Sequence, residues 1–188
     1  MMTSLVWENR AARSLEYCNW AATETAFVLE GTVILFLDRL PARVTYRVEG
    51  DGRWRTRAVT IQQELAGATK YLTLEIDDKQ VWHTAGAALA FATGLYDIDL
   101  EITPATNTIP IRRMGLGQGD ARSVEAVWVR FPSLTLEPLQ QRYTRLDRLL
   151  YRYEGLSIGY ETLLEVDESG LVRDYRGLWR QVHHDTPL

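Results

Sequence analysis

The feature that most restricts the fold of this chain is the alternation of apolar and polar residues, which recurs along nearly its whole length. Residues 43–49 place Val44, Tyr46 and Val48 on one side of an extended strand and polar residues on the other. Because successive side chains of a strand point to opposite faces, such a segment buries one face of a sheet. No window of the sequence sustains the period of an amphipathic helix. The pattern therefore predicts a protein built mainly of β-strands.

The same reading gives roughly ten strands at the spacing of antiparallel hairpins. Turn signals such as E-G-D-G, D-D-K and E-S-G separate several of them. The strand at 25–37 is long, and Gly31 in its middle indicates a bulge or a bend. Residues 134–154 fit either strand or helix. The other predicted strands are residues 5–10, 15–21, 43–49, 53–64, 70–76, 80–84, 97–102, 124–131, 158–166 and 171–175.

One segment favours a short helix, at residues 109–116. Asn107 or Thr108 would cap its first turn, and Gly115 or Gly117 would end it. We expect at most two such helices. The alternation predicts one mostly β, mostly antiparallel domain, either a sandwich or a strongly curved sheet. A chain of 188 residues suffices for one sizeable core, which predicts a single domain over residues 1–188.

Composition excludes several classes of protein. The net charge of -4 argues against a nucleic-acid binder. The single cysteine, Cys18, excludes an intramolecular disulfide and a zinc site made of several thiolates. His83 is isolated and the pair His183–His184 is terminal, so we expect neither a metal nor another cofactor. The N-terminus lacks the pattern of a secretory signal, and no apolar run approaches the roughly 20 residues of a transmembrane span, which favours a cytoplasmic location.

Three acidic residues, Asp97, Asp99 and Glu101, share one face of a predicted strand. Neighbours on such a face lie about 6.5–7 Å apart, too far to ligate one cation from adjacent positions. The spacing is near that of the carboxylate pair in an inverting glycoside hydrolase. We favour the plainer interpretation, in which these acids pair across the sheet with an arginine row such as that in residues 53–57.

Two adjacent arginines, Arg112 and Arg113, follow the predicted helix start. Guanidinium groups suit phosphate, carboxylate or sugar hydroxyls. Adjacent residues on a helix point about 100° apart, so both are not expected to contact one ligand. We expect one arginine to form a buried ion pair with Asp97 or Asp99, and the other to be exposed.

Motifs for nucleophilic catalysis are missing from the sequence, and no catalytic residue is assigned. There is no G-x-S-x-G and no phosphate-binding loop, and Cys18 beside aromatic residues is typical of a core position. The aromatic excess of six Trp and nine Tyr over four Phe suits either a filled core or a cavity for an amphipathic ligand. Trp128 lies opposite Val127 and Val129, which predicts a strand covered on both faces.

A family resemblance rests on four motifs. Residues 94–113 read G-x-x-D-x-D-L-x-x-T-P-x-T-N-T-x-P-I-R-R, residues 127–132 read V-W-V-x-F-P, Gln141-x-Tyr143 follows, and residues 166–175 read V-D-x-x-G-L-V-x-x-Y. With these motifs the chain resembles the putative glycolipid-binding family, a bacterial group first described as a domain of unknown function. The likeness extends over essentially the whole chain.

The resemblance implies a long curved sheet wrapped partly around helical elements, similar to the half-barrels of periplasmic lipoprotein carriers that hold acyl chains in an apolar hollow. This rests on likeness of fold, which does not by itself establish function. Leu95 stands where family members often have a cysteine, which argues against a redox or covalent role there. The missing leader argues against a shuttle between membranes.

These observations favour a non-enzymatic binding module for a lipid or glycolipid. The residues expected to meet the polar head or order the rim are Asp97, Asp99, Thr106, Asn107, Arg112, Arg113, Trp128 and Tyr143. One alternative is a hydrolase of glycosidic or ester bonds with Asp97 or Asp99 as acid or base. Another is a structural or interaction protein that forms homo-oligomers through its sheet edges. A large apolar cavity would favour binding, and a cleft with two carboxylates and a raised pKa would favour the enzyme.

Overall fold

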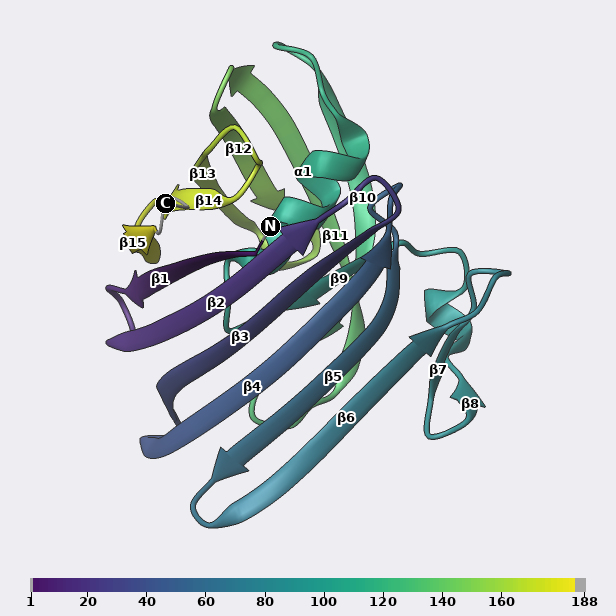
Figure 1. Ribbon diagram of the computed structural model, residues 1–188, viewed down its shortest axis with the longest axis vertical. Helices are drawn as coiled ribbons and strands as arrows, with labels where there is room; N and C mark the ends of the chain where they lie inside the picture. The colour runs from purple at the N-terminus through teal and green to yellow at the C-terminus, as the bar shows by residue number, and fades with distance from the viewer. Residues whose placement is uncertain (1, 185–188) are drawn as a thin grey trace.

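A computed structural model describes residues 2–184, and in this part of the chain fifteen strands form one curved sheet (Figure 1). The sheet is open, and its strands pair antiparallel except β9 and β10, which are parallel. The strands are β1 (Thr3–Asn9), β2 (Ser14–Ala22), β3 (Ala26–Leu37), β4 (Leu40–Asp51), β5 (Thr56–Leu65), β6 (Ala68–Ile76), β7 (Trp82–Thr84), β8 (Ala87–Ala88), β9 (Asp97–Leu100), β10 (Ala121–Val129), β11 (Leu136–Asp147), β12 (Leu150–Gly155), β13 (Tyr160–Val166), β14 (Val172–Tyr175) and β15 (Trp179–His184). The mostly β fold with a long curved sheet is confirmed.

Strands that are consecutive in the chain are neighbours within each of two arms of the sheet. One arm runs from β8 to β1 and the other from β9 to β15, and β1 pairs with β15 where they meet. The first and last strands of the described chain are therefore central strands of the sheet.

The segment that follows β9 lies between the two arms (Figure 1). It contains the 3₁₀ turn η2 (Ala105–Asn107) and the helix α1 (Thr108–Met114). Ile109 is fully buried in the same core as residues of both arms. Two further 3₁₀ turns, η1 (Ala90–Ala92) and η3 (Leu156–Ile158), lie at connections between strands. The space enclosed by the curved sheet is therefore largely filled by the chain itself.

The helix begins and ends close to the predicted positions. Gly115 adopts a left-handed conformation with φ of 52°, and its N–H donates to Ile111 O at 3.2 Å, which closes the last turn. Asn107 is at the N-cap position, but its side chain makes no capping hydrogen bond there. The expected side-chain cap is wrong, because the 3₁₀ turn η2 leads directly into α1. No helix in the described residues is long and apolar enough to cross a membrane.

Gly31 does not mark a bulge, contrary to the expectation from the sequence. Its strand pairs in unbroken register with Cys18 on one side and Tyr46 on the other. A Cβ atom at Gly31 would overlap the ring of Tyr46, which crosses over the glycine. The glycine is required for the close approach of the Tyr46 ring.

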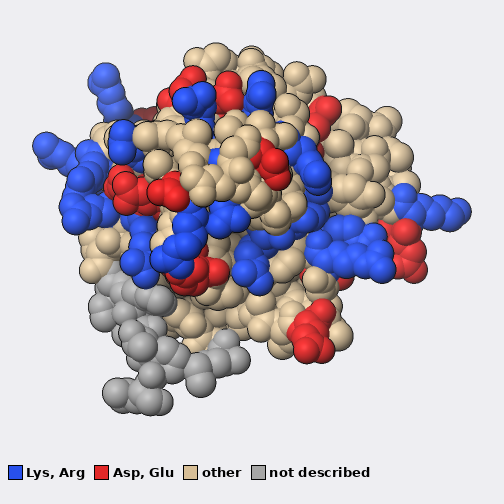
Figure 2. Space-filling model, turned by 90° about the horizontal axis from the view of Figure 1, so that it is seen from above, with Lys and Arg blue, Asp and Glu red and all other residues tan. Residues whose placement is uncertain are grey.

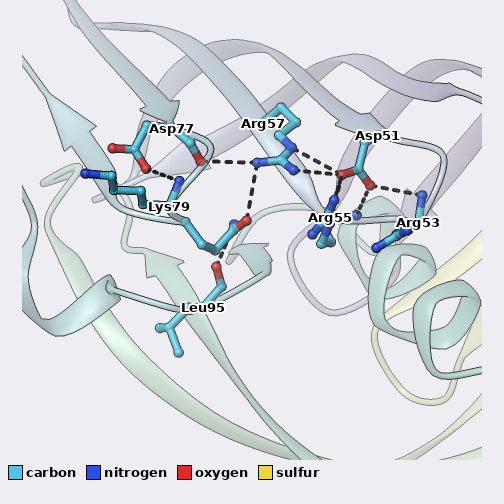
Figure 3. Close-up of polar contacts among 8 residues, drawn as sticks. Asp51, Arg53, Arg55, Arg57, Asp77, Lys79 and Leu95 are labelled. Atoms are coloured by element: carbon cyan, nitrogen blue, oxygen red, sulfur yellow. Dashed lines mark hydrogen bonds and ion pairs between the residues drawn. The ribbon is translucent and has the colours of Figure 1, made fainter.

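The arginines at 53–57 do not pair with the acids of β9. The strand β5 starts only at Thr56, and Arg55 and Arg57 both bind the carboxylate of Asp51 at the end of β4 (Figure 3). The expected pairing across the sheet is therefore wrong. In the view from above, acidic side chains lie among the basic ones, so this face carries mixed charge (Figure 2).

The ambiguous segment 134–154 forms two strands, β11 and β12, joined by a tight turn. The helix alternative is wrong there. The strand count exceeds the predicted ten mainly because this segment, the short β7–β8 hairpin and the C-terminal strand β15 each add to the sheet. The prediction for β10 is confirmed, since its residues 126–129 are all buried and both faces of the strand are covered.

Candidate functional site

A pocket of about 210 Å³ lies among the strands β9–β15. It combines two carboxyl groups with an unusual number of aromatic rings. Its lining residues are Asp99, Leu100, Glu101, Thr103, Asn107, Trp128, Leu139, Tyr153, Ile158, Tyr160, Tyr175, Leu178 and Trp179. This arrangement makes it the strongest candidate for a ligand site on the inner side of the sheet.

Asp99 is the polar centre of this pocket. Its Oδ2 accepts a hydrogen bond of 2.6 Å from Gln141 Nε2, which also lies 3.1 Å from the hydroxyl of Tyr153. Burial raises the pKa of the Asp99 carboxyl to about 7; the bond from Gln141 opposes the rise and the charge of Glu101 adds to it. Near neutral pH the group is therefore divided between a form that donates a hydrogen bond and one that only accepts.

A chain of buried side chains holds Gln141 in place. Asn107 Nδ2 donates to the hydroxyl of Tyr143 at 2.9 Å, and this hydroxyl donates to Gln141 Oε1 at 3.4 Å. Asn107 follows β9, whereas Tyr143 and Gln141 are two residues apart on β11 and so share one face. The position of the Asp99 carboxyl is therefore set by side chains from two segments that are distant in the sequence.

The second carboxylate, Glu101, is held by separate contacts. Its Oε2 accepts the backbone N–H of Phe131 at 2.8 Å, and its Oε1 lies 3.3 Å from Arg130 Nη2. The guanidinium of Arg130 in turn lies over the ring of Trp128, 3.9 Å from its centroid. Glu101 and Trp128 thus form one braced part of the pocket wall.

Aromatic rings form the other wall. Tyr153 lies 6.0 Å from Tyr175 and 6.4 Å from Tyr160, measured between ring centroids. Tyr143 supports this group from behind, 5.2 Å from Tyr153 in an edge-on arrangement. The rings come from β11–β14 because alternate residues of neighbouring strands face the same side. They give the pocket an apolar wall beside its carboxyl groups.

The other acid of the predicted row, Asp97, lies outside the pocket. Arg113 Nε donates to its Oδ1 at 3.0 Å, and the Asp97 side chain is only 1% exposed. Burial raises the pKa of Asp97, and the ion pair with Arg113 opposes this rise. Arg112 is exposed, with its guanidinium 5.0 Å from the centroid of the Trp54 ring. One arginine is thus paired and the other exposed, as expected.

The pocket receives only part of the predicted set of residues. Asp99, Asn107 and Trp128 line it, and Tyr143 stands directly behind it. Thr106 is buried away from the pocket, where its hydroxyl accepts the N–H of Leu100 at 3.3 Å. Asp97, Arg112 and Arg113 contribute to the fold around α1.

Sequence reasoning missed most of the aromatic wall. The pocket residues outside the predicted set are Leu100, Glu101, Thr103, Leu139, Tyr153, Ile158, Tyr160, Tyr175, Leu178 and Trp179, and Gln141 lies behind Asp99. The alternation of Gln141, Tyr143, Tyr151 and Tyr153 was the available signal. It could be used only once residues 134–154 were known to be strands. Among the described residues, no group of three or more His, Cys, Asp or Glu side chains is placed to hold a metal ion.

Comparison with known proteins gives one family and one solved structure. The family model described as "Putative glycolipid-binding" matches residues 4–181. The crystal structure of a DUF1089 family protein from Pseudomonas aeruginosa is 34% identical in sequence and superposes with a TM-score of 0.80. The similarity covers 89% of this chain and 91% of that chain. No curated protein sequence matches the chain.

Proposed function

We propose that this chain binds the sugar head of an amphipathic ligand in the pocket beside Asp99. The chain belongs to the family described as putative glycolipid-binding, and the proposal proceeds from this membership. The observation that carries this proposal is the joining of carboxyl groups and aromatic rings around one small space. At about 210 Å³ the pocket is below the usual range for a drug-sized ligand, about 300–1,000 Å³, so it suits one sugar ring better than an acyl chain.

The chemistry of a sugar ring matches the two walls. One face of the ring carries C–H groups, which pack against aromatic side chains such as Tyr153 and Tyr175. Its hydroxyl groups donate to carboxylate oxygens, and hydrogen bonds to charged groups are stronger than neutral ones. Asp99 and Glu101 supply such acceptors, and the Asn107 side chain lies at the same pocket.

The lipid part of such a ligand would lie outside the pocket. Ile158 and Leu178 line the pocket, and both Ile158 and the nearby Leu156 on η3 are exposed apolar side chains. The helix α1 and its buried neighbours occupy space between the arms, which supports a position for the acyl chains outside the hollow. This modifies the expectation of a lipid held inside the hollow.

Hydrolysis of a glycosidic bond is the second candidate, and the raised pKa of Asp99 favours it. Asp97 is not available as the second group, because it is buried against Arg113. Glu101 would have to act as base, but its two oxygens already accept from Arg130 and from the N–H of Phe131. Glu101 would have to give up one of these contacts to take a proton from water, so binding without hydrolysis is favoured.

The test is native mass spectrometry with monoglucosyl diacylglycerol and with diacylglycerol that lacks the sugar. We expect only the sugar-bearing lipid to bind and to remain intact, and Asp99→Asn to weaken binding about tenfold, the loss of one charge-assisted hydrogen bond. Asp78→Asn, an exposed acid in the β6–β7 turn, is the matched control and should bind normally. Equal binding of both lipids, or unchanged binding by Asp99→Asn, would contradict the proposal. Release of free glucose would instead support the hydrolase.

A further inference from the structure

A second and larger hollow, of about 600 Å³, lies on the outward face of the strands β2–β6. Tyr17 and Asn19, which line it, alternate along β2 with Glu16 and Cys18, which are buried on the inner face. The hollow is thus on the opposite side of the sheet from the core and shares no lining residue with the pocket at Asp99. It is open to solvent along its length.

The strand register places its side chains in two transverse rows. The first row is Tyr17, Thr32, Thr45, Gln62 and Tyr71, each the direct partner of the next across adjacent strands. The second row is Asn19, Glu30, Arg47, Thr60 and Thr73, paired in the same way. Since direct partners project to the same face of a sheet, all ten side chains face the hollow together.

Tyrosines stand at both ends of the first row. Four strand spacings of about 4.8 Å separate Tyr17 on β2 from Tyr71 on β6, a span of about 19 Å. Their rings are well exposed, at 50% for Tyr17 and 72% for Tyr71. The hydroxyl of Tyr17 donates to Ser4 Oγ at 3.1 Å, which holds this ring in position.

Between the tyrosines the surface is polar but carries no net charge. Thr32, Thr45 and Gln62 supply hydroxyl and amide groups that both donate and accept. The charged lining residues are Glu30 and Arg47, and they bind each other at 2.7 Å. A ligand that matches this surface therefore needs many hydroxyl groups, apolar ring faces and no strong charge.

We infer that the outward hollow of β2–β6 binds a neutral oligosaccharide that lies across the strands from Tyr17 to Tyr71. The end rings pack against the C–H faces of sugar units, and the threonine, glutamine and asparagine side chains exchange hydrogen bonds with their hydroxyls. The inference does not depend on the function proposed for the pocket at Asp99, because the two sites share no residue.

The probes are cellotetraose, maltotetraose and N-acetylchitotetraose, each titrated into the isotope-labelled full chain and followed by amide chemical shifts. We expect at least one of them to shift amides of β2–β6, with Thr32, Thr45, Thr60 and Thr73 among them. Tyr17→Ala and Tyr71→Ala should each weaken binding about tenfold, in line with the loss of one ring contact. If no probe shifts these amides, the inference is wrong.

Two control variants make the result specific. Phe36→Ala removes an exposed ring from the same face outside the hollow and should bind as the wild type does. Asp78→Asn, an exposed acid that lines neither site, should also bind normally, and because the shifts are read at the β2–β6 amides, failure of the pocket proposal leaves this result unaffected. Shifts confined to residues around Asp99, or equal affinity for wild type and both tyrosine variants, would overturn the inference. The inference would also be overturned if the protein formed a dimer through this face and Tyr71→Ala converted that dimer to a monomer.

Discussion

At the scale of single residues, Glu16 is a carboxyl group buried inside the sheet. It lies on β2 with 1% of its surface exposed, and its Oε1 accepts from the hydroxyls of Tyr46 and Thr103. No described group bonds its Oε2. Burial raises the pKa of this carboxyl to about 8, so Glu16 is mostly protonated at neutral pH. A buried acid links the inner face of one arm to the segment before α1.

Glu16 makes stability depend on pH. Because its pKa is about 8 in the folded state and near 4.5 when unfolded, only the folded protein keeps the proton between these values. Stability should therefore fall as pH rises from 5 to 8, by on the order of 1.4 kcal/mol per pH unit. Glu16→Gln should reduce this slope, which urea denaturation at several pH values measures. Part of the decrease in stability with rising pH should remain in Glu16→Gln, because the pKa of Asp99 is also raised in the folded state.

The control for this experiment is Glu24→Gln, which changes an exposed acid in the β2–β3 turn. Its pH profile should match that of the wild type. A Glu16→Gln profile as steep as the wild type would show that Glu16 is not the group that holds the proton.

At the scale of elements, the unit formed by β9 and α1 depends on tertiary contacts. The helix has only seven residues, Thr108–Met114, too few for a stable helix on its own. Arg113 on the helix binds Asp97 at the start of β9, and Thr106 bonds the backbone of the same strand. These contacts fix the direction in which β9 presents Asp99 to its pocket.

Two adjacent arginines allow a matched test of this unit. Arg113→Ala would leave Asp97 buried without its partner, and breaking a buried pair in this way costs about 3–5 kcal/mol. Arg112→Ala removes an exposed guanidinium over Trp54, worth about 0.5–1 kcal/mol. The measurement is the free energy of unfolding in denaturant. Similar losses for the two variants would contradict the role assigned to the ion pair.

At the scale of the whole molecule, the sheet is held at its middle by the strands nearest the two chain ends. In the strand register, the backbone of Arg180 on β15 lies opposite Glu8 on β1 and opposite Asp174 on β14. Trp7 Nε1 donates to Val172 O at 2.7 Å, and Gln63 Nε2 donates to Pro132 O at 3.0 Å, so side chains join the arms in two further places. Cooperative folding of the sheet should therefore require β15.

Proline substitutions test this arrangement. Arg180→Pro should cost about 3 kcal/mol or more and abolish a single unfolding transition, since proline cannot donate within a central strand. Ala88→Pro lies on the edge strand β8 and should cost less than about 1 kcal/mol. Both side chains are exposed, so the comparison isolates the backbone. Thermal unfolding followed by circular dichroism gives the result, and equal losses would mean that β15 is not central to stability.

The sequence by itself determined the local features of this protein. Alternation within a strand depends only on the residues of that strand, and it predicted the mostly β fold, the covered faces of β10 and the burial of Val44, Tyr46 and Val48. The angular separation of neighbouring helical residues likewise predicted that Arg112 and Arg113 would have different environments.

Only the tertiary structure decided which residues meet. The pairing of β1 with β15, the binding of Arg55 and Arg57 to Asp51, and the meeting of Asp99 with Gln141 depend on register and on contacts between distant segments. A local pattern cannot specify them, because each strand offers two faces and two edges of similar chemistry. The pocket at Asp99 is formed by such contacts, so three of its residues were predicted and its aromatic wall was found only in the folded protein.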